Sequence, residues 1–192
     1  MRKQYLIAAM CCAAISQAQA VVIAFDLKGT SGTGLLPGNE PVPPAQTNAS
    51  GGEIGAGIFY DDVVNLLTLN IGWGSSQGFR NLSSSATNSH VHGPTASNFG
   101  SGFTQTAGVL FSLTRSSNAS TGGFFTSPSN TITLTDAQET DLLNGKYYVN
   151  IHTTFNSGGE IRGFLVPVPE VSTLVMLSAG LLAVGLWARR KA

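Results

Sequence analysis

Residues 147–166 read YYVNIHTTFNSGGEIRGFLV, and this run indicates a β protein. Residues 147–153 and 160–166 are rich in β-branched and aromatic side chains, which is the usual composition of strands. Gly158-Gly159 between them offers a tight turn into the second strand, because glycine adopts positive φ at little cost. The run therefore predicts two strands near the end of one β domain.

The same pattern recurs along the chain, between turn clusters rich in Gly, Ser, Thr and Asn. Further strands are expected at residues 21–27, 53–60, 63–73, 89–92, 109–115 and 131–133. The strands at 53–60 and 63–73 are separated only by Asp61-Asp62, which predicts a hairpin. Leu67, Leu69 and Ile71 alternate along the second strand and are expected to share one face.

One short helix is predicted after the strand at 131–133. Thr135 and Gln138 have the spacing of a capping box, and Gly145 follows as a stop. Residues 37–52 and 116–130 are rich in Pro, Gly, Ser and Asn, and they are expected to be loops. About eight short antiparallel strands with one helix predict an all-β fold, an antiparallel β-sandwich, over residues 21–168.

The N-terminus has the three parts of an export signal. Arg2 and Lys3 form a basic segment, residues 5–15 an apolar one, and Ala18 and Ala20 a small-residue cleavage site. We expect residues 1–20 to be a signal peptide and the mature chain to begin at Val21. Both cysteines of the chain lie within this segment, so the mature protein must be stable without disulfides.

The C-terminus predicts a membrane segment. Residues 171–188 contain no ionisable side chain, and as a helix they would extend roughly 27 Å, enough for a bilayer core. Arg189, Arg190 and Lys191 follow and would remain cytoplasmic by the positive-inside rule. A single transmembrane helix at 171–188 would leave residues 21–168 outside.

Residues 169–192 resemble the PEP-CTERM sorting signal of exopolysaccharide-producing Gram-negative bacteria. Pro169-Glu170 matches the motif, and the apolar segment and basic tail follow in the expected order. Val171 stands where the family has a second proline. This difference leaves open whether the chain is cleaved there, whereas membrane insertion is still expected. The resemblance implies an exosortase as a processing partner, with exopolysaccharide or surface proteins nearby.

The formal net charge of zero conceals an acidic domain. Half of the ten basic residues lie in the two end segments. The central part has the other five basic residues and ten acidic residues, counting Glu170, so its net charge is −5. No basic cluster is present there, so nucleic acid is not an expected partner.

The three histidines of the chain form the strongest candidate site. His90 and His92 are two residues apart on an expected strand, so both rings point to the same side. If the strand at 147–153 lies nearby, His152 supplies a third ring nitrogen. Three imidazoles can hold Zn²⁺ or Cu²⁺ with one position left open. Glu160 could orient one of the rings.

A structural alternative uses the same residues. Glu160 and Arg162 are two apart on the last expected strand, and they could join His152 in a buried polar network that stabilises the fold. Other chemistry has little support, because the chain has no nucleophile elbow, P-loop or dinucleotide fingerprint.

Five segments, in this order, resemble a CHRD domain, the module repeated in chordin and found singly in many exported bacterial proteins. They are LPGNEPVPP (36–44), HVHGP (90–94), LT with DLLNG (134–135 and 141–145), YVNIHT (148–153) and GGEIRG (158–163). Pro41 is an apparent extra residue in the first segment, so that loop could differ in shape. The resemblance implies an extracellular, β-rich module and leaves its activity open.

Two functions of different classes are compatible with these observations. The leading interpretation is a non-enzymatic binding or matrix protein of the cell envelope, exported and then anchored or sorted. The alternative is a Zn²⁺- or Cu²⁺-binding protein that uses His90, His92 and His152, with redox activity as an option. A purely structural matrix component would need neither metal nor ligand.

Overall fold

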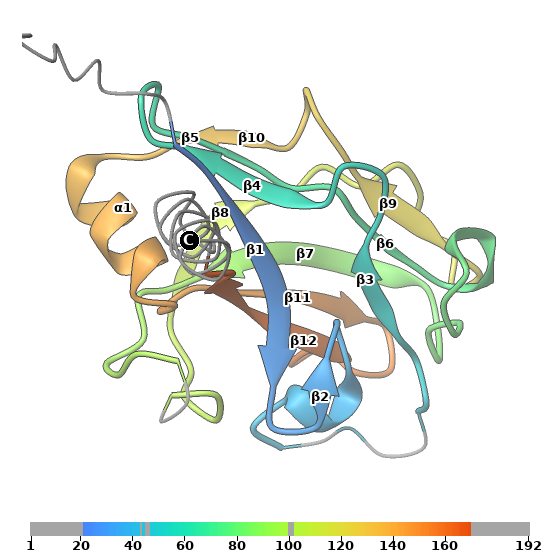
Figure 1. Cartoon of the computed structure of the whole chain (residues 1–192). Coiled ribbons are helices and arrows are strands. Elements are labelled where there is room, and N and C mark those ends of the chain that lie inside the picture. Colours follow the sequence, from blue (N-terminus) through green and yellow to red (C-terminus); the bar gives the residue numbers. More distant parts are fainter. Residues whose placement is uncertain (1–20, 43, 45–46, 100–101, 170–192) are drawn as a thin grey trace, which may run out of the picture.

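The computed structural model describes residues 21–42, 44, 47–99 and 102–169. This part of the chain is mostly β-structure with one short helix, as predicted (Figure 1). Its strands form two curled antiparallel sheets, an arrangement consistent with a β-sandwich.

The larger sheet has nine strands in the order β10-β5-β4-β1-β12-β11-β7-β8, with β2 paired to β1. Its strands are β1 (Val22–Gly29), β2 (Gly32–Thr33), β4 (Ile58–Asp61), β5 (Leu66–Thr68), β7 (Ala86–His92), β8 (Val109–Ser112), β10 (Thr131–Thr133), β11 (Tyr148–Thr153) and β12 (Ile161–Pro167). The neighbours β12 and β11 are the two strands of the run at 147–166. Antiparallel pairing places Asn150 opposite Arg162 and Tyr148 opposite Phe164.

The smaller sheet has three strands, β3 (Gly51–Glu53), β6 (Ile71–Trp73) and β9 (Gly123–Phe125), in the order β3-β6-β9. Trp73 and Phe125 pack their rings 5.3 Å apart and are fully buried. They belong to one hydrophobic cluster with Val149, Ile151 and Leu165 of the larger sheet. The two sheets therefore share a single core.

Alternation along β11 sends its side chains to two different environments. Val149 and Ile151 enter the shared core, whereas Tyr148, Asn150 and His152 point to the outer face of the larger sheet. The connection between β7 and β8 covers part of that face, where Phe103 and Ala107 pack on Tyr148 and Phe164. The candidate site lies on this outer face, outside the main core.

The helix α1 (Asp136–Leu143) forms where it was predicted. The Thr135 side chain accepts from the Gln138 backbone N–H, and the Gln138 side chain accepts from the Thr135 N–H. Two short 3-10 turns, Pro37–Asn39 and Ser75–Gln77, were not predicted.

Three strand predictions need correction. The hairpin of 53–60 with 63–73 forms, but each arm breaks in two: β4 pairs with β5 in the large sheet, and β3 pairs with β6 in the small one. The segment 116–130, expected to be a loop, contains β9, and β2 was missed. Leu67 in β5, Leu69 in the break and Ile71 in β6 are all fully buried.

The signal peptide with Ala18 and Ala20, residue Glu170 and the membrane segment at 171–188 lie outside the described residues. Pro169 is described and exposed. Within the described ranges, no helix is long and apolar enough to cross a membrane.

Candidate metal centre

The pairing of β7 with β11 brings the three histidines together. His90 lies opposite Asn150 and His92 opposite Tyr148, while His152 lies opposite Asn88. The three rings are therefore neighbours on the outer face, with centroids 5.0 to 6.1 Å apart. His90 and His92 are about sixty residues from His152 in sequence, and the pairing of β7 with β11 makes them neighbours in space.

The ring nitrogens of the three histidines lie close to one another. One nitrogen from each histidine can be chosen so that all three lie within 4.8 Å of one another. His90 Nδ1 and His152 Nε2 are 3.2 Å apart. Two ligands at about 2.05 Å from a tetrahedral Zn²⁺ would be about 3.3 Å apart, so this pair already matches neighbouring coordination positions.

Backbone carbonyls fix the orientation of two of the rings. His92 Nδ1 lies 3.0 Å from the Ala107 oxygen, and His152 Nδ1 lies 2.8 Å from the Ser157 oxygen. A carbonyl only accepts, so each Nδ1 carries the proton and each Nε2 keeps its lone pair. This is the arrangement that orients metal-bound histidines in proteins.

His92 Nε2 is the most informative atom of the cluster. His92 is 8% exposed, and its Nε2 is buried and has no hydrogen-bond partner among the described residues. A buried acceptor without a partner costs about 1–3 kcal/mol. A cation at the centre of the cluster would satisfy it.

The surroundings favour the neutral imidazole at His90 and His92 by lowering the pKa of both. Burial, with the neighbouring His152 and His92 rings, lowers the pKa of His90 to about 4. Burial also lowers the pKa of His92, although the Ala107 carbonyl acts in the opposite direction. Neutral imidazole is the form that binds metal, so protons compete weakly for these two ligands.

An aromatic and cationic stack supports the cluster from one side. The Tyr148 ring stacks on His92 with centroids 4.8 Å apart and an interplanar angle of 1°. The Arg162 guanidinium lies 4.4 Å from the Tyr148 centroid and donates to the Phe103 carbonyl. Arg162 is fully buried, so the stack fixes both the ring and the connection that covers it.

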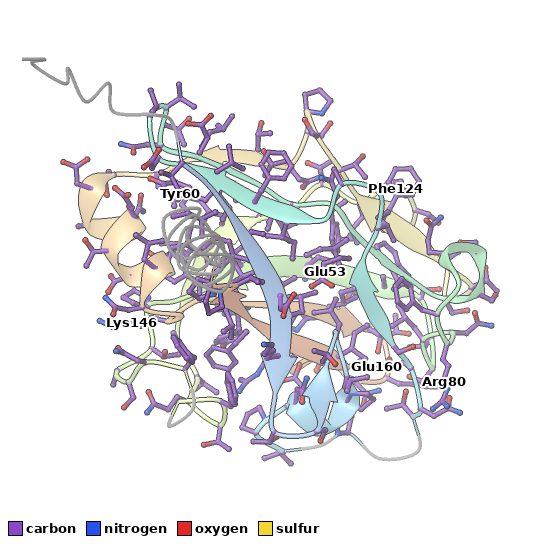
Figure 2. All side chains as sticks on the ribbon, viewed as in Figure 1. Glu53, Tyr60, Arg80, Phe124, Lys146 and Glu160 are labelled. Atoms are coloured by element: carbon purple, nitrogen blue, oxygen red, sulfur yellow. The ribbon has the colours of Figure 1, made fainter. Side chains whose placement is uncertain are left out.

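Glu160 lies elsewhere, near the start of β12 (Figure 2). Its buried carboxylate accepts five hydrogen bonds, from the Thr47, Ser83 and Thr153 hydroxyls, the Ser83 N–H and the Asn156 amide. Burial alone would raise the pKa of Glu160, but these bonds outweigh it and hold the pKa below 4.5. The expected single network of Glu160, Arg162 and His152 is thus divided, and Ser157 rather than Glu160 orients His152.

Two further residues at the site were missed from sequence. Glu40 is 7% exposed and faces Arg162, and burial raises its pKa to about 7 against the effects of Arg162 and Asn150. Asn150 is also buried, on β11 between Tyr148 and His152. Both residues stand in the segments 36–44 and 148–153 quoted above, but sequence alone did not bring them together.

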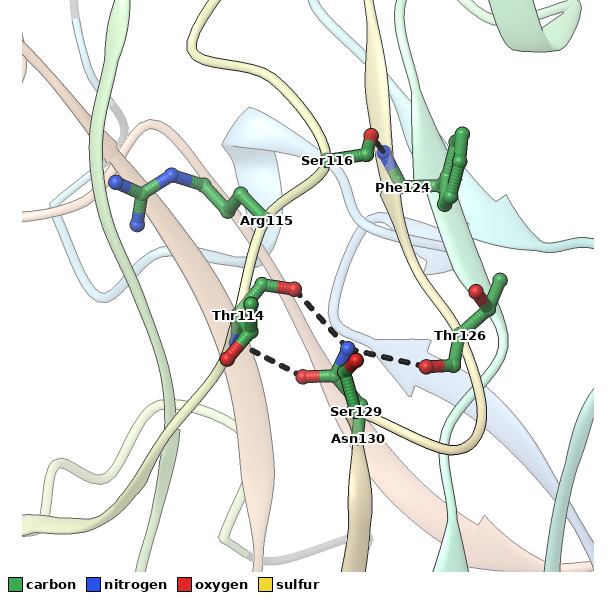
Figure 3. A pocket seen from close by; sticks show the side chains of 7 residues that line it. All are labelled: Thr114, Arg115, Ser116, Phe124, Thr126, Ser129 and Asn130. Carbon is green, nitrogen blue, oxygen red and sulfur yellow. Dashed lines mark hydrogen bonds between the residues drawn. The ribbon is translucent and has the colours of Figure 1, made fainter.

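Two hollows lie away from the histidines. A small one of about 90 Å³ beside β9 is lined by Asn130, whose amide bonds Thr114 and Thr126 (Figure 3). A wider groove of about 520 Å³ is lined by residues 40–42, 44 and 155–159, and the Phe155 side chain there is 79% exposed. The hollow at Asn130 is formed by side-chain hydrogen bonds that hold neighbouring segments together. The groove beside Phe155 exposes an aromatic ring next to the loop that orients His152.

The fold and the site together define an all-β module with a histidine cluster on the outer face of its larger sheet. A family model described as the CHRD domain matches residues 32–165, which is 134 of the 192 residues. The chain therefore belongs to the CHRD domain family. CHRD domains are typically extracellular or secreted, in agreement with the expected export. No curated protein and no solved structure matches the chain.

Proposed function

We propose that this protein is a non-enzymatic binding module of the bacterial cell envelope that holds one divalent transition-metal ion, Zn²⁺ or Cu²⁺, at His90, His92 and His152. The observation that carries the proposal is the buried Nε2 of His92, which has no hydrogen-bond partner in the described part of the chain and belongs to a cluster of nitrogens no more than 4.8 Å apart. Imidazole nitrogen is a favoured ligand of both ions. Redox activity would require Cu²⁺, because Zn²⁺ has no redox chemistry. The identity of the bound ion therefore decides whether redox activity is available to the site.

Metal analysis of the full chain tests the proposal. The protein is purified without a histidine tag, and zinc and copper are measured by mass spectrometry in the native protein, His92→Ala and His152→Ala. We expect about one ion per native chain and a loss of at least tenfold in both variants. Thr87→Ala, an exposed change on the same strand as His92, is the control. Equal, near-zero metal in all four proteins would exclude the site.

The groove beside Phe155 favours a second binding function, for exopolysaccharide. Phe155 and Val42 are 79% and 82% exposed, and the groove that they flank offers Asn156 and Ser157 as hydrogen-bonding groups. An exposed ring beside polar groups suits the apolar face and the hydroxyls of a sugar. Retention on exopolysaccharide is expected to fall in Phe155→Ala and to persist in Phe124→Ala, a half-exposed ring on β9 (Figure 2). Equal retention of both variants would rule out the groove.

The envelope location is a further part of the proposal. We infer that the export signal and the PEP-CTERM-like segment deliver residues 21–168 across the inner membrane, where a helix at 171–188 holds them until an exosortase acts. Cell fractionation with mass spectrometry of both ends of the mature chain tests this. Cleavage after Ala20 is expected. Recovery of the intact chain from the cytosol, with Met1 still attached, would refute export.

A further inference from the structure

A second buried acceptor lies beside the histidine cluster. Asn150 Oδ1 is buried and has no hydrogen-bond partner among the described residues, the same condition as His92 Nε2. Asn150 is 3% exposed, lies directly opposite His90 in the strand pairing and stands two residues from His152 on β11. The Asn150 side chain also lies within hydrogen-bonding reach of the His92 ring, although no hydrogen bond of good geometry joins Oδ1 to Nε2.

Two buried acceptors at one place repel each other unless a donor or a cation lies between them. His92 does not provide the donor, because its proton is on Nδ1 and faces the Ala107 carbonyl. Moving that proton to Nε2 would leave two acceptors facing each other at Ala107. The site therefore lacks one positive centre that both atoms can share.

Glu40 fixes the orientation of the Asn150 side-chain amide. Its nitrogen Nδ2 faces the Glu40 carboxylate, and the hydrogen bond between these side chains stabilises the charged form of Glu40. The reversed amide would place its oxygen against that carboxylate. Gly159 makes the approach possible, since a Cβ there would collide with Glu40 Oε1 and lie 2.9 Å from Asn150 Nδ2. Oδ1 thus points away from Glu40.

We propose that Asn150 Oδ1 is the fourth protein ligand of the ion held by His90, His92 and His152, and that Glu40 positions it. This inference rests on the proposed metal site and deepens it. A set of three nitrogens and one amide oxygen closes a tetrahedron, and four protein ligands are typical of zinc sites that stabilise structure. Closed coordination agrees with a binding module, because a catalytic zinc keeps one position for water or substrate.

Competition titrations of the full chain with Zn²⁺ test the ligand. We expect Asn150→Ala to bind Zn²⁺ about 10- to 100-fold more weakly than the native chain. Asn150→Asp in a Glu40→Gln background, where the new oxygen faces an amide and not a carboxylate, should bind at least as tightly as Glu40→Gln alone, because a carboxylate is a stronger ligand than a neutral amide oxygen. Asn88→Ala, an exposed asparagine on β7, should leave the affinity unchanged. If Asn150→Ala fails to fold by circular dichroism, the double variant decides alone: binding weaker than that of Glu40→Gln refutes the ligand.

A spectroscopic readout separates a ligand from a merely structural residue. With Cu²⁺ bound, the electron paramagnetic resonance g∥ value should change in Asn150→Ala and Asn150→Asp and stay native in Asn88→Ala. Native affinity together with a native spectrum in Asn150→Ala overturns this inference while the three-histidine site stands. Absence of binding by the native chain overturns both proposals.

Discussion

Two buried charged residues, Glu160 directly before β12 and Arg162 within it, are stabilised in different ways. Glu160 has five hydrogen-bond donors around its carboxylate, whereas Arg162 relies on the Tyr148 and Phe164 rings and one carbonyl. Arg162 Nε and Glu40 Oε1 have no partner within the described part of the chain. Glu160 therefore has the features of a structural group, whereas the atoms of Glu40, Asn150, His92 and Arg162 that lack a partner among the described residues belong to residues at or beside the histidine cluster.

The Glu160 carboxylate allows a stability prediction. In Glu160→Gln the new NH₂ group faces donors such as the Ser83 N–H, so we expect the free energy of unfolding to fall by about 2 kcal/mol. Urea denaturation measures this change. Asp26→Asn removes the same charge from an exposed pair with Lys28 and should cost less than about 1 kcal/mol.

The same variant has a defined pH dependence. The pKa of Glu160 is lower in the folded protein than its ordinary value of 4.5, so its ionisation contributes stability fully above that value. This contribution is lost as the pH falls through the folded-state pKa. The difference in stability between native and Glu160→Gln should therefore be constant from pH 8 to 6 and shrink below about pH 4. A difference that grows on acidification would contradict the assignment.

At the level of elements, the connection between β7 and β8 depends on one guanidinium. Arg162 stacks on Tyr148 and donates to Phe103, and Tyr148 Oη lies 3.3 Å from both the N and O atoms of Ala107. Lysine has no planar group to stack, so we expect Arg162→Lys to destabilise the protein by about 2–3 kcal/mol. Amides of residues 102–108 should exchange faster in deuterium-exchange measurements. Arg80→Lys, at an exposed arginine, is the control (Figure 2).

The helix offers a smaller and independent test. Thr135→Ala removes the hydroxyl that accepts from Gln138, and we expect it to lower the free energy of unfolding by about 1 kcal/mol. Thr33→Ala, at an exposed position on β2, should change stability by less. Thermal denaturation followed by circular dichroism distinguishes the two. An equal effect of both substitutions would show that the capping box contributes nothing.

Sequence predicted the elements whose signals are local. The capping box located α1, and the β-rich composition located β11 and β12. It failed at β9, because Gly123–Phe125 is three residues long within a glycine- and serine-rich segment and is a strand only through its pairing with β6. It also failed to divide residues 63–73 between two sheets, since that break depends on which sheet each half meets.

At the candidate site, too, sequence predicted only what local patterns indicate. His90 and His92 were recognisable as neighbours from the period of a strand, and His152 as a third ligand if the strands met. The roles of Glu40 and Asn150 were not recognisable, because they depend on a contact between residues more than one hundred positions apart in sequence. Gly159, at φ +130°, permits that contact, and no local pattern indicates it.

At the scale of the molecule, the sheet order explains why the quoted segments lie together. β12 and β11 are central neighbours, β7 follows them, and residue 36 bridges to Arg162 at the other side. Segments from residues 36–42, 90–94, 148–153 and 158–163 therefore meet around one face. A metal ion bound there would link β7 to β11 directly and oppose the separation of these two strands on unfolding.

That link predicts a metal-dependent stability. Zn²⁺ that binds only the folded chain, supplied at 100 times its dissociation constant, adds about 2.7 kcal/mol to the free energy of unfolding. For a domain of this size the melting temperature should rise by about 5–10 °C. Scanning calorimetry of the native chain with Zn²⁺, with a chelator, and of His90→Ala under both conditions measures the effect. His90→Ala should show a much smaller shift, because only two imidazoles and Asn150 Oδ1 remain as ligands. A shift of equal size in His90→Ala would place the ion elsewhere and remove the histidine cluster as the cause.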